Sequence, residues 1–400
     1  MPSLVIVVHY AEIALKGGNR PWFEQRLRED IAERLSGIPD AKVRRERGRL
    51  VVSLAGAAEA QVADALDRVS RTPGVAWFAA AREVERDMEA LRAAVLARAH
   101  GSTGSFRVET KRSDKTFPLT SMEVNRVLGA AVVEATGRKV DLGAPESVYG
   151  VEIAAKRAFV FGDRVQGPGG LPLGTSGRVI ALISGGIDSP VAAWRMMRRG
   201  CRVLGVHFLN ASIGGEGVRE KLDLLGEALA RWQGRFQMRI VPFEALQRAI
   251  VAAVPADHRM IVYRRTMLRL ADRLREREGA KALVTGDSVG QVASQTLDNL
   301  ACAYAAVKGP ILSPLCAAEK TEIIDRARRI GTYEASILPH QDCCSFLIAE
   351  HPATKAVLHE VEAMEAAVAW GNLQEEAIQG TELRSYPASA GDVQRTAPGA

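Results

Sequence analysis

The sequence predicts a multidomain protein, with α+β structure in its first part and an α/β domain with a doubly wound parallel sheet in its second. Before about residue 165, short β-branched strands and helices follow one another in the manner of small α+β domains. From Arg178 onward, apolar strands alternate with helices, which is typical of a parallel sheet covered on both faces. Residues 166–177 are rich in Gly and Pro and read as the linker between the two parts.

The first 80 residues predict a β-α-β-β-α-β-like, ferredoxin-like arrangement. Strands are expected at 4–10, 50–54 and 75–79, with helices from Pro21 to about Leu35 and from 58 to 70. The densest basic run, at residues 42–49, leads into the second strand. We expect this first domain to cover residues 1–58, or to extend to about residue 75.

A second small domain is expected over residues 59–165. Its predicted elements are helices at 88–100 and 122–136, the first capped by Asp87 and the second by Ser121, a strand at 105–110, and a hairpin of 148–154 and 157–161.

The α/β domain is expected over residues 178–386. Its predicted strands are 179–183, 203–208, 238–242 and 282–285, and its predicted helices are 190–199, 218–232 and 257–278. Ligands of such sheets bind at the carboxyl ends of the strands. Residues 387–400, mostly small and polar, are expected to form a disordered tail.

Composition narrows the class of protein. The chain has 400 residues, 47% of them hydrophobic, without an apolar run that could span a membrane. Five cysteines without a C-x-x-C pair argue against a disulfide framework and a zinc site, and favour a reducing cytoplasm. The net charge of +6 is compatible with a nucleic-acid partner.

The most informative stretch is the glycine turn Ser184-Gly185-Gly186-Ile187-Asp188-Ser189 between a buried strand and a helix. Glycines let the backbone approach a phosphate, the serine hydroxyls can donate, and the helix N-terminus favours an anion. No Gly-Lys-Ser/Thr follows, so the loop is not a Walker A motif. It suits an enzyme that releases pyrophosphate, and Ser-Gly-Gly-x-Asp-Ser is the signature of PP-loop ATP pyrophosphatases. An ordinary strand–turn–helix junction is the alternative.

Asp188 stands at this phosphate site as a carboxylate, which repels phosphate unless it is linked to Mg²⁺ or organises the loop. A helix N-cap is its alternative role.

A second polar turn follows the strand that ends near Thr285. It contains Gly286, and Gln291 and Gln295 are expected on one face of a following helix. The upstream helix offers Arg264, Arg265 and Arg269 as cations for phosphates, although a solvated basic face explains the last two equally well.

The adjacent Cys343 and Cys344 lie in a polar, loop-like setting. A buried cysteine usually packs as a small hydrophobe, but a thiol beside an adenylating site suggests sulfur chemistry.

Together these motifs resemble the family of tRNA 4-thiouridine synthetases, which are PP-loop tRNA sulfurtransferases. The resemblance extends to about residue 385 and rests on residues 12–24, 169–175, 184–189, 283–296 and 342–344, followed by Pro352-Ala353-Thr354-Lys355. It implies a ferredoxin-like domain, a THUMP RNA-binding domain at 59–165 and a PP-loop catalytic domain. The ATP contacts it implies are Leu182, Ile183, Ser184, Gly185, Gly186, Ser189, His207, Phe208, Arg264, Gly286 and Gln295. It implies Cys344 as the catalytic cysteine, with Asp188 acting at the loop.

The implied reaction uses ATP and Mg²⁺ to convert uridine 8 of tRNA to 4-thiouridine through an adenylated uridine. Sulfur would come from a persulfide supplied by a cysteine desulfurase or another carrier, and a homodimer is implied. The family's role in thiamine thiazole synthesis depends, in some members, on a rhodanese-like domain, which we do not expect after residue 386. Two alternatives stay open: another PP-loop adenylating enzyme, or a non-catalytic RNA-binding protein.

Overall fold

The computed structural model describes residues 3–339, 347–387 and 394–396, without the side chains of 213–216 and 394–396. The chain divides into two compact units, Met1–Thr175 and Ser176–Ala400. Within the described residues, no helix is both long and apolar enough to cross a membrane.

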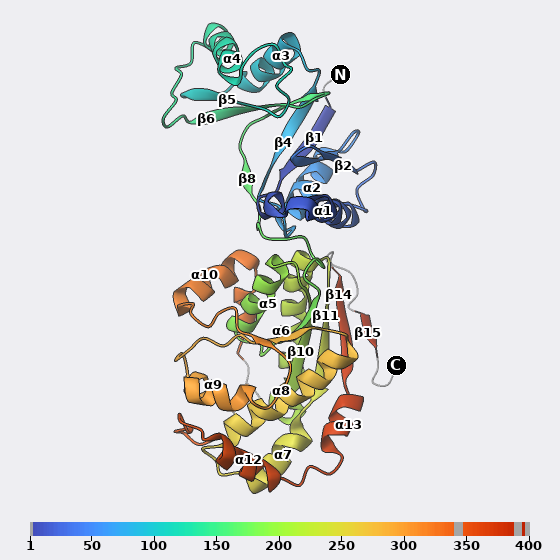
Figure 1. Ribbon diagram of the computed structural model, residues 1–400, viewed down its shortest axis with the longest axis vertical. Coiled ribbons are helices and arrows are strands. Elements are labelled where there is room, and N and C mark those ends of the chain that lie inside the picture. The colour runs from blue at the N-terminus through green and yellow to red at the C-terminus, as the bar shows by residue number, and fades with distance from the viewer. Residues whose placement is uncertain (1–2, 340–346, 388–393, 397–400) are drawn as a thin grey trace. The chain divides into compact units, whose positions relative to one another are not determined.

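The first unit contains one sheet in the order β2-β3-β1-β4-β7-β6-β5, with β8 paired to β4 (Figure 1). All its strand pairs are antiparallel except β5 with β6. Its strands are β1 (Ser3–His9), β2 (Lys42–Glu46), β3 (Arg49–Ser53), β4 (Trp77–Val84), β5 (Phe106–Arg112), β6 (Ser147–Ile153), β7 (Ala158–Phe161) and β8 (Val165–Gln166). Its α-helices are α1 (Arg20–Arg34), α2 (Glu59–Ser70), α3 (Met88–Ala99) and α4 (Ser121–Thr136), and the 3-10 turns η1 (Glu12–Leu15) and η2 (Gly17–Asn19) precede α1.

The continuous apolar run of β1 follows from burial on both faces of the sheet. Ile6 and Val8 pack with residues of α1 and α2. Val5 and Val7 pack on the opposite face with Phe159 of β7. Burying each such side chain contributes on the order of 1.5–3 kcal/mol, so β1 is the central element of this unit.

Three local expectations for this unit are corrected. The basic run at 42–49 contains strand β2, whose pairing with β3 completes the β-α-β-β-α-β order. Helix α4 is capped by Thr120 in a capping box with Glu123, not by Ser121. Gln166, expected as the first residue of the linker, belongs to the short strand β8, which pairs with Trp77 and Phe78 of β4.

The second unit is built on a sheet in the order β13-β12-β9-β10-β11-β14-β15. Its strands are β9 (Arg178–Leu182), β10 (Arg202–Leu209), β11 (Arg235–Pro242), β12 (Ala282–Val284), β13 (Ile311–Leu312), β14 (Glu382–Pro387) and β15 (Gln394–Thr396). Its helices are α5 (Asp188–Arg198), α6 (Ala211–Gln233), α7 (Glu244–Ala253), α8 (Arg259–Arg277), α9 (Leu297–Tyr304), α10 (Lys320–Ile330), α11 (Tyr333–Ser336), α12 (Leu358–Ala366) and α13 (Leu373–Gln379), with the 3-10 turn η3 (Ala293–Gln295).

The predicted doubly wound parallel sheet is confirmed. Strands β13, β12, β9, β10 and β11 are parallel, with α5 and α6 against one face and α8 and α13 against the other (Figure 1). Ile180, Val206 and Phe208 anchor the core under α7 and α8. The carboxyl ends of β9, β10 and β12 therefore meet at one edge, which is where ligands of such sheets bind.

The end of the chain differs from the expectation. Strand β14 joins the sheet antiparallel to β11, and β15 pairs with β14. Residues 394–396 therefore form a strand inside the stretch expected to be a disordered tail.

Candidate active site

The loop between β9 and α5 is shaped by its own serines and glycines. Ser184 N donates to Ser189 Oγ at 2.9 Å, and Gly186 N donates to Ser184 Oγ at 3.3 Å. Gly185 has a φ of +87°, a conformation that favours glycine. Helix α5 begins at Asp188, two residues before the predicted start, and its N-cap is Ile187. Asp188 is therefore not the N-cap.

A cavity of about 650 Å³ lies at this edge of the sheet. Its lining includes Asp188 and every predicted nucleotide contact except Gly185: Leu182, Ile183, Ser184, Gly186, Ser189, His207, Phe208, Arg264, Gly286 and Gln295. The remaining lining is apolar on one side, with Met260, Met267 and Leu268 of α8. The fold thus brings together residues that are more than 100 positions apart in the sequence.

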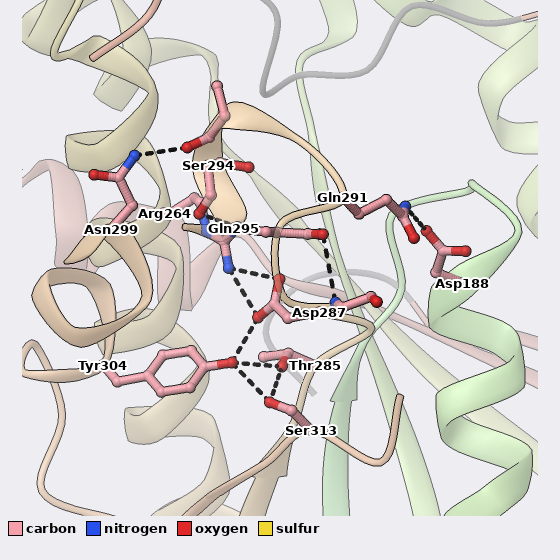
Figure 2. A network of polar contacts seen from close by, with 12 residues as sticks. Asp188, Arg264, Thr285, Asp287, Gln291, Ser294, Gln295, Asn299, Tyr304 and Ser313 are labelled. Atoms are coloured by element: carbon pink, nitrogen blue, oxygen red, sulfur yellow. Dashed lines mark hydrogen bonds and ion pairs between the residues drawn. The ribbon is translucent and has the colours of Figure 1, made fainter. Parts of the chain in front are cut away.

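Asp188 is held from two other elements. Lys320 Nζ lies 2.6 Å from its Oδ1, and Gln291 Nε2 donates to its Oδ2 at 2.8 Å; the second bond is drawn in Figure 2. This arrangement fits the predicted loop-organising role. Lys320 was not predicted from the sequence, because it is 132 positions away and opens an ordinary amphipathic helix. It adds a cation to the cavity lining beside the loop.

Gly286 lets the polar turn after β12 approach the glycine loop between β9 and α5. A Cβ atom at this position would lie 2.9 Å from Ser189 N and 3.0 Å from Ser189 Cα. Both contacts are with backbone, which cannot yield without moving the start of α5. Glycine at 286 is thus required by close packing of the two turns rather than by its φ angle.

Arg264 is oriented by a buried carboxylate (Figure 2). Its Nη2 donates to both oxygens of Asp287, at 2.8 and 2.9 Å. Tyr304 donates to Asp287 Oδ2 at 2.7 Å and contacts Ser313 Oγ at 2.7 Å. Asp287 and Tyr304 were not predicted, because nothing in their local sequence distinguishes them from core polar residues.

The protonation states of this network are fixed. Burial opposes ionisation of Asp287, but the Arg264 charge and the hydrogen bonds from Tyr304 and Arg264 prevail and lower the pKa of this carboxyl. Burial, reinforced by the Asp287 charge, raises the pKa of Tyr304 to about 12. Asp287 is therefore an anion and Tyr304 a neutral donor at neutral pH, which holds Arg264 as a positioned cation at the cavity.

The predicted helix carrying Gln291 and Gln295 is wrong. Gln291 lies in a turn and Gln295 in the 3-10 turn η3, and the following helix, α9, starts at Leu297. Gln295 Oε1 accepts from Ser288 N at 3.4 Å and so braces the turn after β12 (Figure 2).

Arg265 and Arg269 do not serve the cavity. Arg265 is buried, and its Nε donates to Glu365 of α12 at 2.9 Å. Arg269 contacts the same carboxylate at 2.6 and 2.8 Å. Both arginines therefore attach α12 to α8, so the phosphate role is wrong for them, and for Arg265 the solvated-face alternative is wrong as well.

His207 of β10 lines the cavity and contacts the residue that follows β9. Its Nδ1 lies 2.7 Å from the carbonyl oxygen of Ile183. A carbonyl only accepts, so Nδ1 carries the proton and the ring orientation is fixed.

The predicted catalytic Cys344 and its neighbour Cys343 lie outside the described residues. Of the cysteines that are described, Cys201 and Cys302 are buried and Cys316 is exposed. Among described side chains, no group of three or more His, Cys, Asp or Glu could hold a metal ion.

Comparisons with known proteins extend these observations. Residues 5–79 match the ThiI ferredoxin-like domain, residues 83–163 the THUMP domain, and residues 174–370 the family described as thiamine biosynthesis protein (ThiI). A probable tRNA sulfurtransferase of Thermus thermophilus is 43% identical over 96% of this chain and 95% of its own. One of Moorella thermoacetica is 41% identical over 94% of this chain and 96% of its own.

A solved structure agrees in both fold and sequence. The crystal structure of a 4-thiouridine synthetase–RNA complex with bound ATP has a TM-score of 0.87 and 35% identity, covering 96% of this chain and all of that one. The resemblance read from the motifs is thereby confirmed. The chain belongs to the ThiI family of tRNA sulfurtransferases, with a ferredoxin-like domain, a THUMP domain and a PP-loop ATP pyrophosphatase domain.

Proposed function

We propose that this chain uses ATP to transfer sulfur to tRNA and converts uridine 8 to 4-thiouridine. The observation that carries the proposal is the cavity at the start of α5. There a glycine loop without a lysine of its own faces Arg264 and Lys320, which come from other elements. A phosphate-binding site built this way suits a triphosphate whose β- and γ-phosphates leave together as pyrophosphate.

The cavity offers separate surfaces for the parts of ATP. Phe208, Met267 and Leu268 give an apolar wall suited to the adenine ring. The N-terminus of α5 and the cations Arg264 and Lys320 suit the phosphates. A related 4-thiouridine synthetase was crystallised with ATP and RNA, which supports both ligands for this chain.

Magnesium fits the residues present. Mg²⁺ at nucleotide sites is usually held by one or two carboxylates together with phosphate oxygens and water. Asp188 lines the cavity and would supply one such carboxylate by exchanging its contact with Lys320 or Gln291 for the ion. The ion, when bound, would neutralise phosphate charge there.

In the proposed reaction, the C4 oxygen of the uracil attacks the α-phosphorus of ATP, and the bond to the pyrophosphate breaks. Arg264, held in place by Asp287, stabilises the negative charge that develops. The terminal sulfur of a persulfide then attacks C4, AMP leaves with the former C4 oxygen, and the sulfur on C4 stays joined to the carrier by an S–S bond. A second thiol, such as that of L-cysteine, attacks the carrier's sulfur, so that the S–S bond breaks, 4-thiouridine is released and the carrier and the thiol are left as a disulfide. Adenylation is needed because a uracil oxygen is a poor leaving group. Cys344 carries the sulfur or releases it from its donor, and a cysteine desulfurase or another persulfide carrier supplies it.

A single-cysteine exchange tests this proposal. The full chain is incubated with unmodified tRNA, ATP, Mg²⁺, L-cysteine and a cysteine desulfurase, and both pyrophosphate and 4-thiouridine are measured. Cys344→Ser should still bind ATP while 4-thiouridine formation is lost. Cys316→Ser, which removes an exposed described thiol, is the matched control and should stay active. Normal 4-thiouridine formation by Cys344→Ser would refute the role of Cys344. Release of pyrophosphate by the unaltered chain without any 4-thiouridine would indicate another adenylating enzyme.

A further inference from the structure

Three apolar side chains that line the cavity have no part in the placement of ATP proposed above. They are Ile187 of the glycine loop, Val292, which precedes η3, and Ile337, which follows α11. Val292 is 52% exposed and Ile337 is 49% exposed. Large apolar side chains that stay exposed in a ligand cavity are usually covered when the ligands bind. These three residues are here called the apolar rim.

The backbone at Ile337 is fixed on both sides and joined to the glycine loop. Ser336 Oγ donates to the carbonyl oxygen of Gly186, the residue before Ile187, at 3.4 Å. Lys221 of α6, which is 1% exposed, donates from Nζ to the carbonyl oxygens of Ser336 and Leu338, both at 2.8 Å. Ile337 is therefore held at the edge of the loop while its own side chain stays exposed.

Val292 is joined to the same loop by its own neighbour. Gln291 Nε2 donates to Asp188 Oδ2 at 2.8 Å, a bond drawn in Figure 2, and Asp188 is the residue after Ile187. The carbonyl oxygen of Val292 accepts from Gln295 N at 2.9 Å. Hydrogen bonds from two other segments thus reach the residues on either side of Ile187, and the apolar rim gathers at the loop end of the cavity.

The position of the apolar rim indicates what covers it. The adenine ring is assigned to the wall of Phe208, Met267 and Leu268, and the phosphates to the loop. In the proposed reaction the C4 oxygen of a uracil has to reach the α-phosphorus, so the ring enters beside the loop. Enzymes that act on a base take it out of its stack and hold its faces between apolar or aromatic side chains. The apolar rim offers such side chains at the place where the base arrives.

We propose that Ile187, Val292 and Ile337 form the subsite that holds the uracil ring of the target nucleotide against the α-phosphate of ATP. This inference rests on the proposed function, because it assumes that an RNA base enters the cavity. Apolar contacts with the faces of a ring do not distinguish one base from another. The apolar rim therefore positions the base for attack and does not select it.

Each exposed member of the apolar rim has a matched control beside it. Val289, 47% exposed, lies three residues before Val292, and Leu338, 41% exposed, follows Ile337. Both of these described residues lie outside the cavity lining. Val292→Ala and Ile337→Ala are therefore compared with Val289→Ala and Leu338→Ala. All four side chains are about half exposed, so the variants are expected to fold like the unaltered chain.

The test measures tRNA-dependent pyrophosphate release by the full chain at saturating ATP and tRNA. Its kcat should fall about three- to tenfold in Val292→Ala and in Ile337→Ala, because less apolar surface covers the base. The affinity for ATP should stay the same. The affinity for tRNA should change less than about twofold, because phosphate contacts supply most of the affinity for a nucleic acid. Ile337→Val, which keeps a branched apolar side chain, should retain most of the rate, and the two control variants should retain all of it.

Three results would overturn the inference. The first is an equal kcat in the rim variants and their controls. The second is a loss of ATP affinity in the rim variants, since the apolar rim would then contact the nucleotide. The third is normal pyrophosphate release with a loss of 4-thiouridine only when a protein supplies the sulfur, since the apolar rim would then bind that protein. Rim-dependent pyrophosphate release without any 4-thiouridine from the unaltered chain would support the base subsite and refute the proposed function.

Discussion

Gly286 shows how a single missing methyl group controls the candidate site. Alanine there would place its Cβ 2.9 Å from Ser189 N, against backbone at the start of α5. Overpacking of this kind costs about 1–3 kcal/mol. We expect Gly286→Ala to weaken ATP binding about tenfold or more, measured by titration calorimetry. Gly217→Ala, at a glycine of α6 with nothing within 4 Å, is the control. Unchanged ATP affinity in Gly286→Ala would contradict the close approach of the two turns.

Replacing Lys320 is expected to change the activity of the protein but not its stability. Its side chain is 43% exposed, so its ion pair with Asp188 contributes only about 0–1 kcal/mol to folding. As a cation on the cavity wall, it contributes to the charge that phosphates meet. Lys320→Met should therefore leave the melting temperature nearly unchanged and reduce tRNA-dependent pyrophosphate release by more than about tenfold. Lys308→Met, at an exposed lysine of the same unit, should change neither; equal rates in the two variants would remove Lys320 from the site.

At the scale of elements, the strands with a clear apolar pattern could be predicted from the sequence. β1, β9, β10 and β12 bury apolar side chains and coincide with expected strands to within a few residues. The glycine loop and the turn at Gly286 follow two of these strands directly, which is why most of the cavity lining was predictable.

Other elements could not be predicted, because their stabilising contacts are polar or distant. Strand β2 is a basic edge strand, and charges at an edge prevent aggregation without marking a strand. Strand β14 buries Arg384 and Tyr386, which are both bonded to Asp223, so its buried face is not apolar. Lys320 reaches the site only through the packing of α10 on α5.

The packing of β14 against α6 predicts whether a glycine-to-alanine substitution in α6 raises or lowers the free energy of unfolding. A Cβ at Gly226 of α6 would lie 2.5 Å from the buried Tyr386 ring. Alanine normally stabilises a helix by about 0.5–1 kcal/mol relative to glycine. Overpacking of about 1–3 kcal/mol should outweigh that gain here. Gly226→Ala should thus destabilise the protein in urea unfolding, whereas Gly217→Ala in the same helix should stabilise it. Stabilisation by both would show that Tyr386 does not occupy this position.

At the scale of the whole molecule, the two N-terminal family domains share one sheet. Strand β4 pairs with both β1 and β7, and Glu152 of β6 contacts His9 of β1 and Arg49 of β3. Arg49 and Glu152 are each 2% exposed. Removing one partner of such a buried pair typically costs about 3–5 kcal/mol. Glu152→Gln should lower the stability of this unit by that order at neutral pH.

The pH dependence of this contact follows from its charges. Burial alone would raise the pKa of Glu152, but the His9 hydrogen bond and the His9 and Arg49 charges outweigh it, so the folded pKa is lowered. The stabilisation is therefore fully present above the unfolded pKa of about 4.3 and is lost as pH falls through the folded pKa. Urea unfolding from neutral to acidic pH should show a shallower acid loss for Glu152→Gln than for the unaltered chain. Identical acid slopes would contradict this assignment.

The two units together imply one chemical outcome, which mass spectrometry of tRNA nucleosides tests most directly. Transfer RNA is isolated from cells with and without this gene product, and 4-thiouridine is sought at position 8. We predict 4-thiouridine at position 8 when the chain is present, and its loss when the chain is absent or carries Cys344→Ser. The same amount of 4-thiouridine with and without the chain, in cells lacking any other such enzyme, would contradict the proposed function.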